Sequence, residues 1–442
     1  MIRACLAALA MAAGLLPVST LAAQTTGPQA PVVTLGEARR RAAVVDPNAI
    51  AARAQVASAG WERRAARMDL FTPNVALVTT YARATTPLFG GATDDGFIIS
   101  NTATSATLQG RYTLLGDGKL SSLKRARASL ESAEASETAV RFRTALETDM
   151  AYFAVLADRE LLRVATERLA RAREQFGIAR VRVSAGDVLA TDSLQLLLEV
   201  NRAQLALLRQ DSALAVSRLR LGRRIGLPGQ ADAAPIDTTL PAPLPLSEEE
   251  LIREMRQRGP DIEAARAAER RASAVVATER EGYFPDIILS ASKAASDSVL
   301  FPSAVRSNQF AVSVSLPIWD GGQRELSVAR ARLQRDIARA ERDDRERAAA
   351  ELMTEAYHGY RTARAGTELA LVGVRVAAET YRVQGVRYRE GATTILDLLE
   401  AQIALSEAEA ALVQSRYATH LGLAQIEALL GRRLADAAPT NR

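Results

Sequence analysis

The stretch VRYREGATTILDLLEAQ, residues 386–402, is the part of the chain from which its organisation is best understood. A helix-compatible run is interrupted at Gly391, and an apolar-periodic segment begins again a few residues later. Glycine adopts positive φ at no steric cost, so the chain can reverse direction here. Thr394 and Asp397 have the spacing of a capping box, which begins a new helix. The stretch therefore predicts a hairpin of two helices with its tip near Gly391.

A similar stretch, VRVSAGDVLATDSLQ, occurs earlier at residues 181–195. Gly186 corresponds to Gly391 and Asp192 to Asp397, both at an offset of 205 (391 − 186 and 397 − 192). Further pairs at offsets between 203 and 213 are Pro47 with Pro260, Pro73 with Pro285, Asp117 with Asp320 and Gly226 with Gly431. Ordered pairs with slowly drifting offsets indicate an internal duplication, with each copy roughly 200 residues long.

The N-terminal residues 1–23 have the features of a secretory signal peptide. Arg3 precedes an apolar stretch from Ala4 to Val18, and small residues follow at positions 22 and 23. The single cysteine, Cys5, lies inside this segment, so we expect the mature chain to contain neither a disulfide nor a thiol nucleophile. No other apolar run approaches the roughly 20 residues of a membrane-spanning helix. We therefore expect an exported protein that enters a membrane, if at all, without helices.

The composition favours long helices. Hydrophobic residues make up 48% of the chain but aromatic residues only 5%, which is typical of long packed helices. Residues 119–176 contain neither glycine nor proline, and as one helix they would be roughly 87 Å long. The net charge is +5, but arginines alternate with acidic residues, as in 341–347. This pattern indicates a solvated helical surface, and we expect no nucleic-acid partner.

Two segments have the period-two alternation of β-hairpins, about residues 75–115 and 286–317. The sharpest alternation places Phe310, Val312 and Val314 on one side of the strand. The polar or small residues on the other side are Gln309, Ala311, Ser313 and Ser315. Strands with one apolar and one polar face suit a transmembrane barrel, and we predict that these three side chains face lipid. Four strands cannot close a barrel, whereas three chains would supply 12.

The predicted fold class is mainly α with β, built from an internal duplication. The first repeat covers 24–226, with its helical tip near residue 186, and a proline-rich linker covers 227–246. The second repeat covers 247–432, with its tip near residue 391, and 433–442 form a flexible tail. Long helical hairpins would form an α-helical barrel, and four transmembrane strands per chain would contribute to a trimeric 12-stranded β-barrel.

These features resemble the TolC-like outer membrane factor family, also called outer membrane efflux proteins, from Thr34 to Gly431. The most specific motifs are RYREGATTILDLLEAQ (387–402), LPIWDGGQRE (316–325) and YFPDI (283–287). The resemblance implies a homotrimer in the bacterial outer membrane, in contact with its lipid, with the helical part in the periplasm. It implies a passive exit duct of an efflux or secretion system, coupled through a periplasmic adaptor protein to an inner-membrane pump. Many relatives carry a lipid-modified cysteine, which this sequence lacks.

The resemblance also implies a periplasmic gate made by polar links between the helical hairpins. The matching positions are Asp192, Tyr388, Asp397 and Glu400, and the turns at Gly186 and Gly391 would contact the adaptor. Thr393 stands where some relatives have an arginine donor. We predict a hydrogen bond from the Tyr388 hydroxyl to Asp192. An alternative role for Asp397 is simply to cap its own helix.

No catalytic, cofactor or metal site is predicted. The two histidines, His358 and His420, have no second ligand nearby in sequence, and the segment 116–119 lacks the residues of a P-loop. We expect a protein that is not an enzyme. The alternatives are a periplasmic coiled-coil adaptor or tethering protein without its own channel, or an exported coiled-coil scaffold. The cargo, whether drugs, metal ions or secreted polypeptides, stays open.

Overall fold

The computed structural model describes residues 30–85, 89–93, 96–100, 102–116, 118–185, 190–237, 240–241, 243–297 and 304–434. Within these ranges, the side chains of residues 89–100 and of Leu120 are not described. The predicted signal peptide, Gly186, Asp117 and nearly all of the predicted tail lie outside the described residues.

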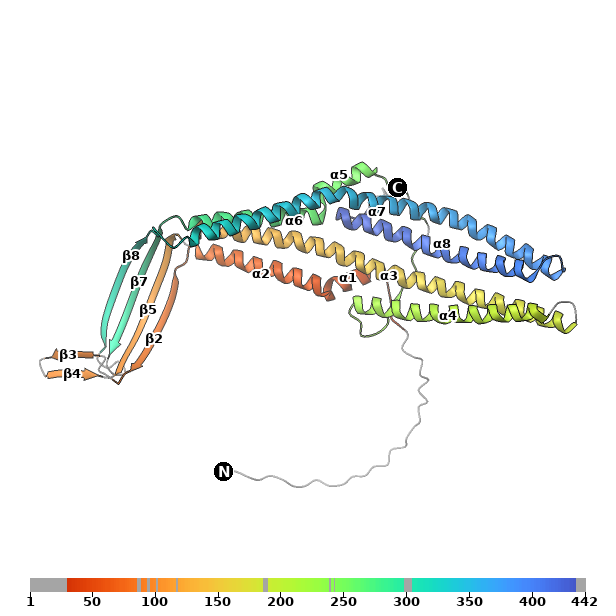
Figure 1. The fold of residues 1–442 in the computed structure, drawn as a ribbon. Helices are drawn as coiled ribbons and strands as arrows, with labels where there is room; N and C mark the ends of the chain where they lie inside the picture. Colours follow the sequence, from red (N-terminus) through yellow and green to blue (C-terminus); the bar gives the residue numbers. More distant parts are fainter. Residues whose placement is uncertain are drawn as a thin grey trace, which may run out of the picture.

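The chain is elongated, with a β-sheet at one end and two helical hairpins at the other (Figure 1). The helices are α1 (Leu35–Val45), α2 (Pro47–Asp69), α3 (Lys119–Ala185), α4 (Ala190–Arg224), α5 (Glu248–Arg258), α6 (Pro260–Glu281), α7 (Gln323–Arg389) and α8 (Ile395–Leu430). No helix in the described part of the chain is both long enough and apolar enough to cross a membrane.

The two halves repeat one plan: a pair of helices, a β-hairpin, a long helix, a tip and a shorter helix. The long helices α3 and α7 each contain 67 residues, and the returning helices α4 and α8 contain 35 and 36. Pro47 and Pro260 each occupy the first turn of a helix, where the missing N–H costs no intrahelical hydrogen bond. Because both repeats have a proline at this position, a new helix begins at the same place in each repeat.

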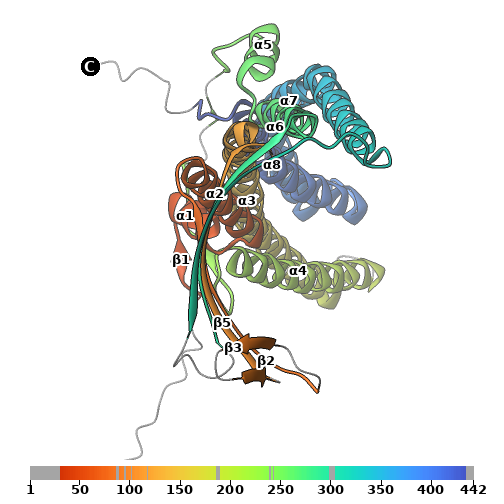
Figure 2. The ribbon, with the colours of Figure 1, turned by 90° about the vertical axis from the view of Figure 1, so that its left-hand side faces the viewer.

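The strands are β1 (Val32–Val33), β2 (Asn74–Arg83), β3 (Phe89–Thr93), β4 (Gly96–Ser100), β5 (Thr102–Leu115), β6 (Asp232–Ala233), β7 (Asp286–Asp297) and β8 (Val305–Ser315). Four of them form one antiparallel sheet in the order β2-β5-β7-β8. The pairing of β5 with β7 joins the two repeats, so β2 and β8 are the edges. This sheet extends beyond the helices as a single curved layer (Figures 1 and 2).

On one face of the sheet the register aligns apolar positions at the end near the helices, and Lys293, Arg306 and Asn308 continue the same face toward the other end. Val75 pairs with Gly110, Gly110 with Ala291 and Ala291 with Phe310, so these residues form one row on one face. The adjacent row contains Ser292 and Gln309 on the other face. Opposed residues of a ladder share a face, so the predicted alternation extends across all four strands.

Two short pairings were not predicted from the sequence. Within the first predicted β-hairpin, the segment from 84 to 104 contains the antiparallel pair β3–β4 and the start of β5. Its glycines weaken the period-two pattern from which strands are recognised. The proline-rich linker contains β6, which pairs in parallel with β1. Strands of two residues are too short to show any periodicity.

The main core lies midway along the helices. Tyr152 and Phe153 of α3 pack there with Leu214 and Leu221 of α4. The β1–β6 pair covers this cluster, and the Tyr152 hydroxyl donates a hydrogen bond of 2.7 Å to the carbonyl oxygen of Ala234. This core fixes the base of the first helical hairpin, and a second cluster, with Met353 of α7 and Ile426 of α8, fixes the base of the second. Both leave the tips at the far end from the sheet (Figure 1).

Candidate functional site

The tip of the second hairpin has the predicted turn and capping box. Gly391 has φ +69°, where any side chain would be strained. The Asp397 amide donates to the Thr394 hydroxyl (3.3 Å), and the Thr394 amide donates to Asp397 Oδ2 (3.1 Å). Thr393 also donates its hydroxyl to Asp397 Oδ2, at 2.8 Å. These hydrogen bonds form a capping box, so the prediction that Asp397 caps its helix is confirmed. The hydrogen bonds from Thr394 and Thr393 also lower the pKa of Asp397.

Tyr388 lies just before this turn and is buried, with 3% of its surface exposed. Its ring packs in an apolar cluster with Ala179, Leu196 and Leu398, and its hydroxyl has no hydrogen-bond partner among the described residues. Burial raises the pKa of Tyr388, the charge of Asp192 raises it further, and Arg182 opposes the shift. Asp192 is therefore close enough to act electrostatically but forms no bond to the hydroxyl. The prediction of a Tyr388–Asp192 hydrogen bond is wrong.

Another predicted gate residue, Glu400, is exposed and forms no ion pair or hydrogen bond with a described residue. Gly186, the predicted turn of the first tip, lies outside the described residues. In the structure, Asp397 caps its helix and the Tyr388 ring is buried. A gate formed by the four predicted residues stays a prediction.

In the tip-proximal part of the hairpins, three polar links join the first hairpin to the second, and the sequence did not predict them. All three start on α3. Arg171 forms a bidentate pair with Glu409 of α8, with Nη1–Oε1 at 3.2 Å and Nη2–Oε2 at 2.8 Å. Arg182 donates from Nη1 to the carbonyl oxygen of Tyr388, at 2.8 Å, and its guanidinium lies 5.4 Å from the centre of the ring.

The third link joins Gln175 Nε2 to the Tyr381 hydroxyl, at 3.3 Å. Positions 171, 175 and 182 are spaced by four and seven residues, which places them on one face of a helix. One signal in the sequence could have pointed to Arg182. It corresponds to Arg387, the residue before Tyr388, by the same offset of 205 that relates the two tips (387 − 182 = 205). Together the links tie the first hairpin to the second along the tip-proximal part of α3.

The sheet carries the second set of predicted residues. Phe310, Val312 and Val314 share one face of β8 and are 86%, 68% and 66% exposed. Their common face and exposure agree with the alternation expected from the sequence, and their contact with lipid stays a prediction. The other face is polar and forms a groove of about 930 Å³, whose lining includes Arg111, Ser290, Ser292, Gln309 and Ser313.

Large aromatic side chains are exposed where the strands meet the helices. Phe71, between α2 and β2, is 77% exposed, and Phe284, between α6 and β7, is 58% exposed. Trp319, between β8 and α7, is 82% exposed. Girdles of aromatic residues mark the interfaces of membrane proteins, where one part of the ring is in an apolar environment and the other in water. The junction therefore has the composition of a membrane–water interface.

The described residues contain no group of three or more His, Cys, Asp or Glu side chains arranged to hold a metal ion. His358 lies 3.4 Å from Glu248, and His420 packs beside the Phe153 ring with its centroid 5.8 Å away. Burial lowers the pKa of His420. The His358 side chain is 57% exposed, and the buried Nε2 of His420 has no hydrogen-bond partner among the described residues.

Comparison with known proteins gives consistent results. The model of the family described as "Outer membrane efflux protein" matches residues 39–227 and 251–432. Protein CyaE of Bordetella pertussis is 29% identical over 359 residues, covering 78% of this chain and 74% of CyaE. The probable efflux pump outer membrane protein TtgC of Pseudomonas putida is 26% identical, covering 80% of this chain and 73% of TtgC.

The fold agrees with a solved structure as well. The CmeC outer membrane channel of Campylobacter jejuni superposes with a TM-score of 0.78, at 17% identity, covering 90% of this chain and 85% of CmeC. At this identity the likeness shows the fold alone. The family model covers most of both repeats, including both helical hairpins and the four-stranded sheet. The chain belongs to the outer membrane efflux protein family.

Proposed function

We propose that this chain is the outer-membrane exit duct of an efflux or secretion system, through which cargo passes passively from the periplasm to the exterior. The observation that carries the proposal is the four-stranded sheet, which has an exposed apolar face, a polar groove on the opposite face and two unpaired edges. Backbone groups cannot stay unpaired in lipid, so such a sheet needs closure by further strands. The family is a transport family, and we assign no catalytic step.

A ring of three chains would satisfy both edges and give 12 strands. The helices support the same arrangement, because α2 packs on α3, α3 on α6 and α6 on α7, which leaves α2 and α7 at the sides of the layer. Large apolar side chains are exposed on both: Trp61 and Met68 on α2, and Leu333 and Ile337 on α7. Such exposed apolar surface is expected where a neighbouring chain packs.

The helical tips would hold the periplasmic end of the duct. In this proposal the links from Arg171, Gln175 and Arg182 keep the two hairpins of each chain together in the resting state. Tyr388 contributes through its carbonyl oxygen and its buried ring rather than through its hydroxyl. The turns near Gly186 and Gly391 are the proposed contacts for a periplasmic adaptor, which would couple the duct to an inner-membrane pump.

The test is whether the chain forms a closed, conducting oligomer. The mature protein would be extracted from membranes in detergent, its mass measured by native mass spectrometry, and the same preparation inserted into planar lipid bilayers. The duct predicts a trimer and discrete conductance steps. A monomer that stays soluble without detergent and gives no conductance would instead support an adaptor or tethering protein.

A further inference from the structure

Four arginines gather on one side of the helical layer, next to the sheet. They line a groove of about 610 Å³ together with three apolar residues: Arg63, Arg64, Arg67, Leu70 and Phe71 from α2 and its C-terminal end, and Leu123 and Arg127 from α3. The groove therefore combines a cationic wall with an apolar end formed by Leu70 and Phe71.

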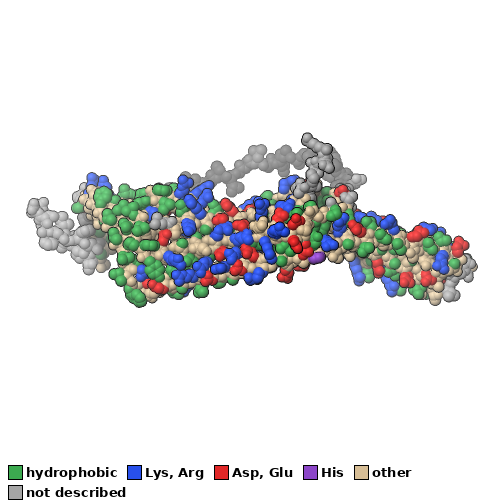
Figure 3. Space-filling view, turned by 90° about the horizontal axis from the view of Figure 1, so that it is seen from above, with side chains coloured by type: hydrophobic (Ala, Val, Ile, Leu, Met, Phe, Trp, Pro, Cys, Tyr) green, Lys and Arg blue, Asp and Glu red, His purple; other side chains and the backbone are tan. Residues whose placement is uncertain are grey.

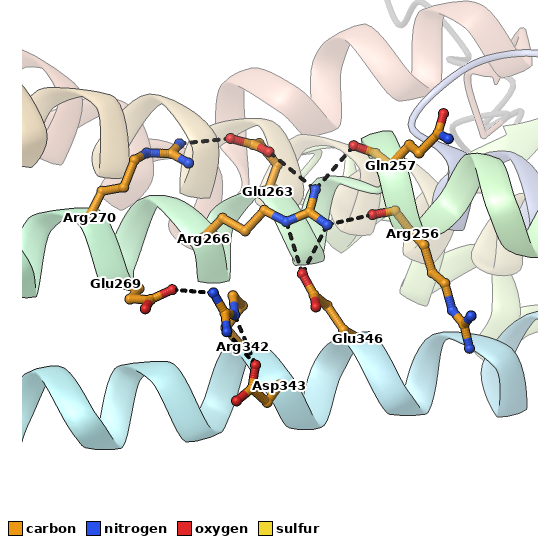
Figure 4. Close-up of polar contacts among 9 residues, drawn as sticks. All are labelled: Arg256, Gln257, Glu263, Arg266, Glu269, Arg270, Arg342, Asp343 and Glu346. Atoms are coloured by element: carbon orange, nitrogen blue, oxygen red, sulfur yellow. Dashed lines mark hydrogen bonds and ion pairs between the residues drawn. The ribbon is translucent and has the colours of Figure 1, made fainter.

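None of these four guanidinium groups forms an ion pair or hydrogen bond with a described residue. Arg64 only stacks over the Trp61 ring, 4.6 Å from its centroid. The neighbouring helices α6 and α7 show the usual arrangement, in which Arg266 pairs with Glu346 and Arg342 with Glu269 (Figure 4). Like charges held close together repel one another, so an unpaired cluster favours binding of an anion.

The groove lies toward the apolar face of the sheet rather than toward its polar face. Asp69, Thr72 and Asn74 line both the polar groove of the sheet and a second groove along α2, so that side of α2 is continuous with the polar face. The arginine groove shares none of these residues. It includes instead Phe71, which is 77% exposed at the junction and precedes Val75 of the apolar face by four residues.

The junction is also where apolar surface gives way to charged surface. Figure 3, which views the side of α7, shows hydrophobic side chains covering the strand end of the molecule, with Lys and Arg side chains mixed with Asp and Glu over the adjoining helices. A protein that crosses a membrane through the sheet would have its phospholipid headgroups at this level. Arginine suits such a position because its planar group binds phosphate oxygens through two hydrogen bonds.

We propose that the groove binds the headgroup of an anionic phospholipid from the periplasm-facing leaflet of the outer membrane. The phosphate contacts the guanidinium groups of Arg63, Arg67 and Arg127, and the acyl chains lie over Phe71 and along the apolar face of the sheet. This inference rests on the proposed function, because it requires insertion of the sheet into the membrane. Each chain has one groove, so a trimer would hold three such lipids.

The test compares lipid binding of matched variants. The trimer would be analysed by native mass spectrometry in detergent, with phosphatidylglycerol or zwitterionic phosphatidylethanolamine added at equal concentration. The variant carries Arg63→Gln, Arg67→Gln and Arg127→Gln. The control carries Arg202→Gln, Arg209→Gln and Arg220→Gln, three exposed arginines of α4 far from the sheet, which remove the same charge.

We expect wild type and control to retain up to three phosphatidylglycerol molecules per trimer in preference to phosphatidylethanolamine. Each arginine near an anionic membrane surface strengthens binding by about fivefold, so the groove variant should bind about 100-fold more weakly. A second variant, Arg63→Lys with Arg67→Lys and Arg127→Lys, keeps the charge and should bind at an intermediate level.

Several results would overturn the proposal. One is equal phosphatidylglycerol retention by the groove and control variants. Another is displacement of the lipid by millimolar inorganic phosphate, which would mean that the groove recognises phosphate alone. A third is loss of trimer in the groove variant, with unchanged lipid binding by the lysine variant, which would place the arginines in contacts between chains. If the proposed function itself were wrong, the wild-type chain would fail to form a trimer and to insert, before any difference between variants could be measured.

Discussion

The link between Arg171 and Glu409 gives the sharpest test of how the periplasmic end is held. The pair joins α3 of the first hairpin to α8 of the second through two hydrogen bonds, of 3.2 and 2.8 Å. The two side chains are only 18% and 17% exposed, so solvent screens the pair less than it screens surface ion pairs. The perturbation is Glu409→Gln, which removes the negative charge but keeps the size and one acceptor.

The magnitude follows from the type of contact. Hydrogen bonds to charged groups contribute about 1.5–3 kcal/mol, and neutral ones about 1 kcal/mol, so the substitution should cost roughly 1 kcal/mol per chain. Three chains opening together would lose about 3 kcal/mol of closure. That shifts an open–closed equilibrium by roughly 150-fold toward the open form.

The assay is single-channel recording in planar bilayers, with trimer yield measured in parallel. The matched control is Glu407→Gln, an exposed carboxylate of α8 without an ion pair to a described residue. We expect Glu409→Gln to raise the mean conductance or the open probability, and Glu407→Gln to leave both unchanged. Identical recordings from the two variants, each as an intact trimer, would refute the idea that this link restrains opening.

Three further predictions concern the sheet and the second tip. Val312→Arg should reduce membrane assembly by about 2–4 kcal/mol per chain, whereas Ser313→Arg on the polar face should assemble normally, as measured by trimer yield in membranes. The lowered pKa of Asp397 means that its stabilising contribution is present above the unfolded pKa and is lost as pH falls through the folded pKa. The protection factors of the amides at the start of α8, which correct for the intrinsic exchange rate at each pH, should therefore fall over that acidic range, and Thr394→Ala should lower them at neutral pH. Gly391→Ala should destabilise the tip by about 1 kcal/mol because of its φ of +69°, which faster exchange of the same amides would report; unchanged exchange would contradict it.

The sequence predicted the features that depend on local pattern. Gly391 and the Thr394–Asp397 spacing determine the second tip, because a turn and a cap involve only neighbouring residues. The facing of Phe310 and Val312 followed from period-two alternation, and the register of the sheet confirms that the alternation continues into the other strands. The doubled order of elements followed from landmarks that occur twice.

Features that depend on packing between distant segments could not be predicted. The link between Arg171 and Glu409 spans 238 residues, and nothing in either helix distinguishes these side chains from other exposed-looking charges. The Tyr388 hydroxyl was predicted to donate to Asp192, but the ring lies in an apolar cluster formed by both hairpins, and the hydroxyl has no partner among the described residues. The pairing of β1 with β6 likewise brings together two segments that have no periodicity of their own.

The two aspartates related by the duplication have diverged in what surrounds them. Asp397 is engaged by Thr393 and Thr394, so its hydrogen-bonding capacity is used within its own turn. The positions 205 residues earlier are Val188 and Leu189, which have no side-chain donor. Asp192 accordingly lacks the threonine donors of its counterpart, and it forms no hydrogen bond or ion pair with a described residue. Of the two predicted gate carboxylates at equivalent positions, Asp397 is thus the one held by hydrogen bonds among the described residues, and the gate role of both stays a prediction.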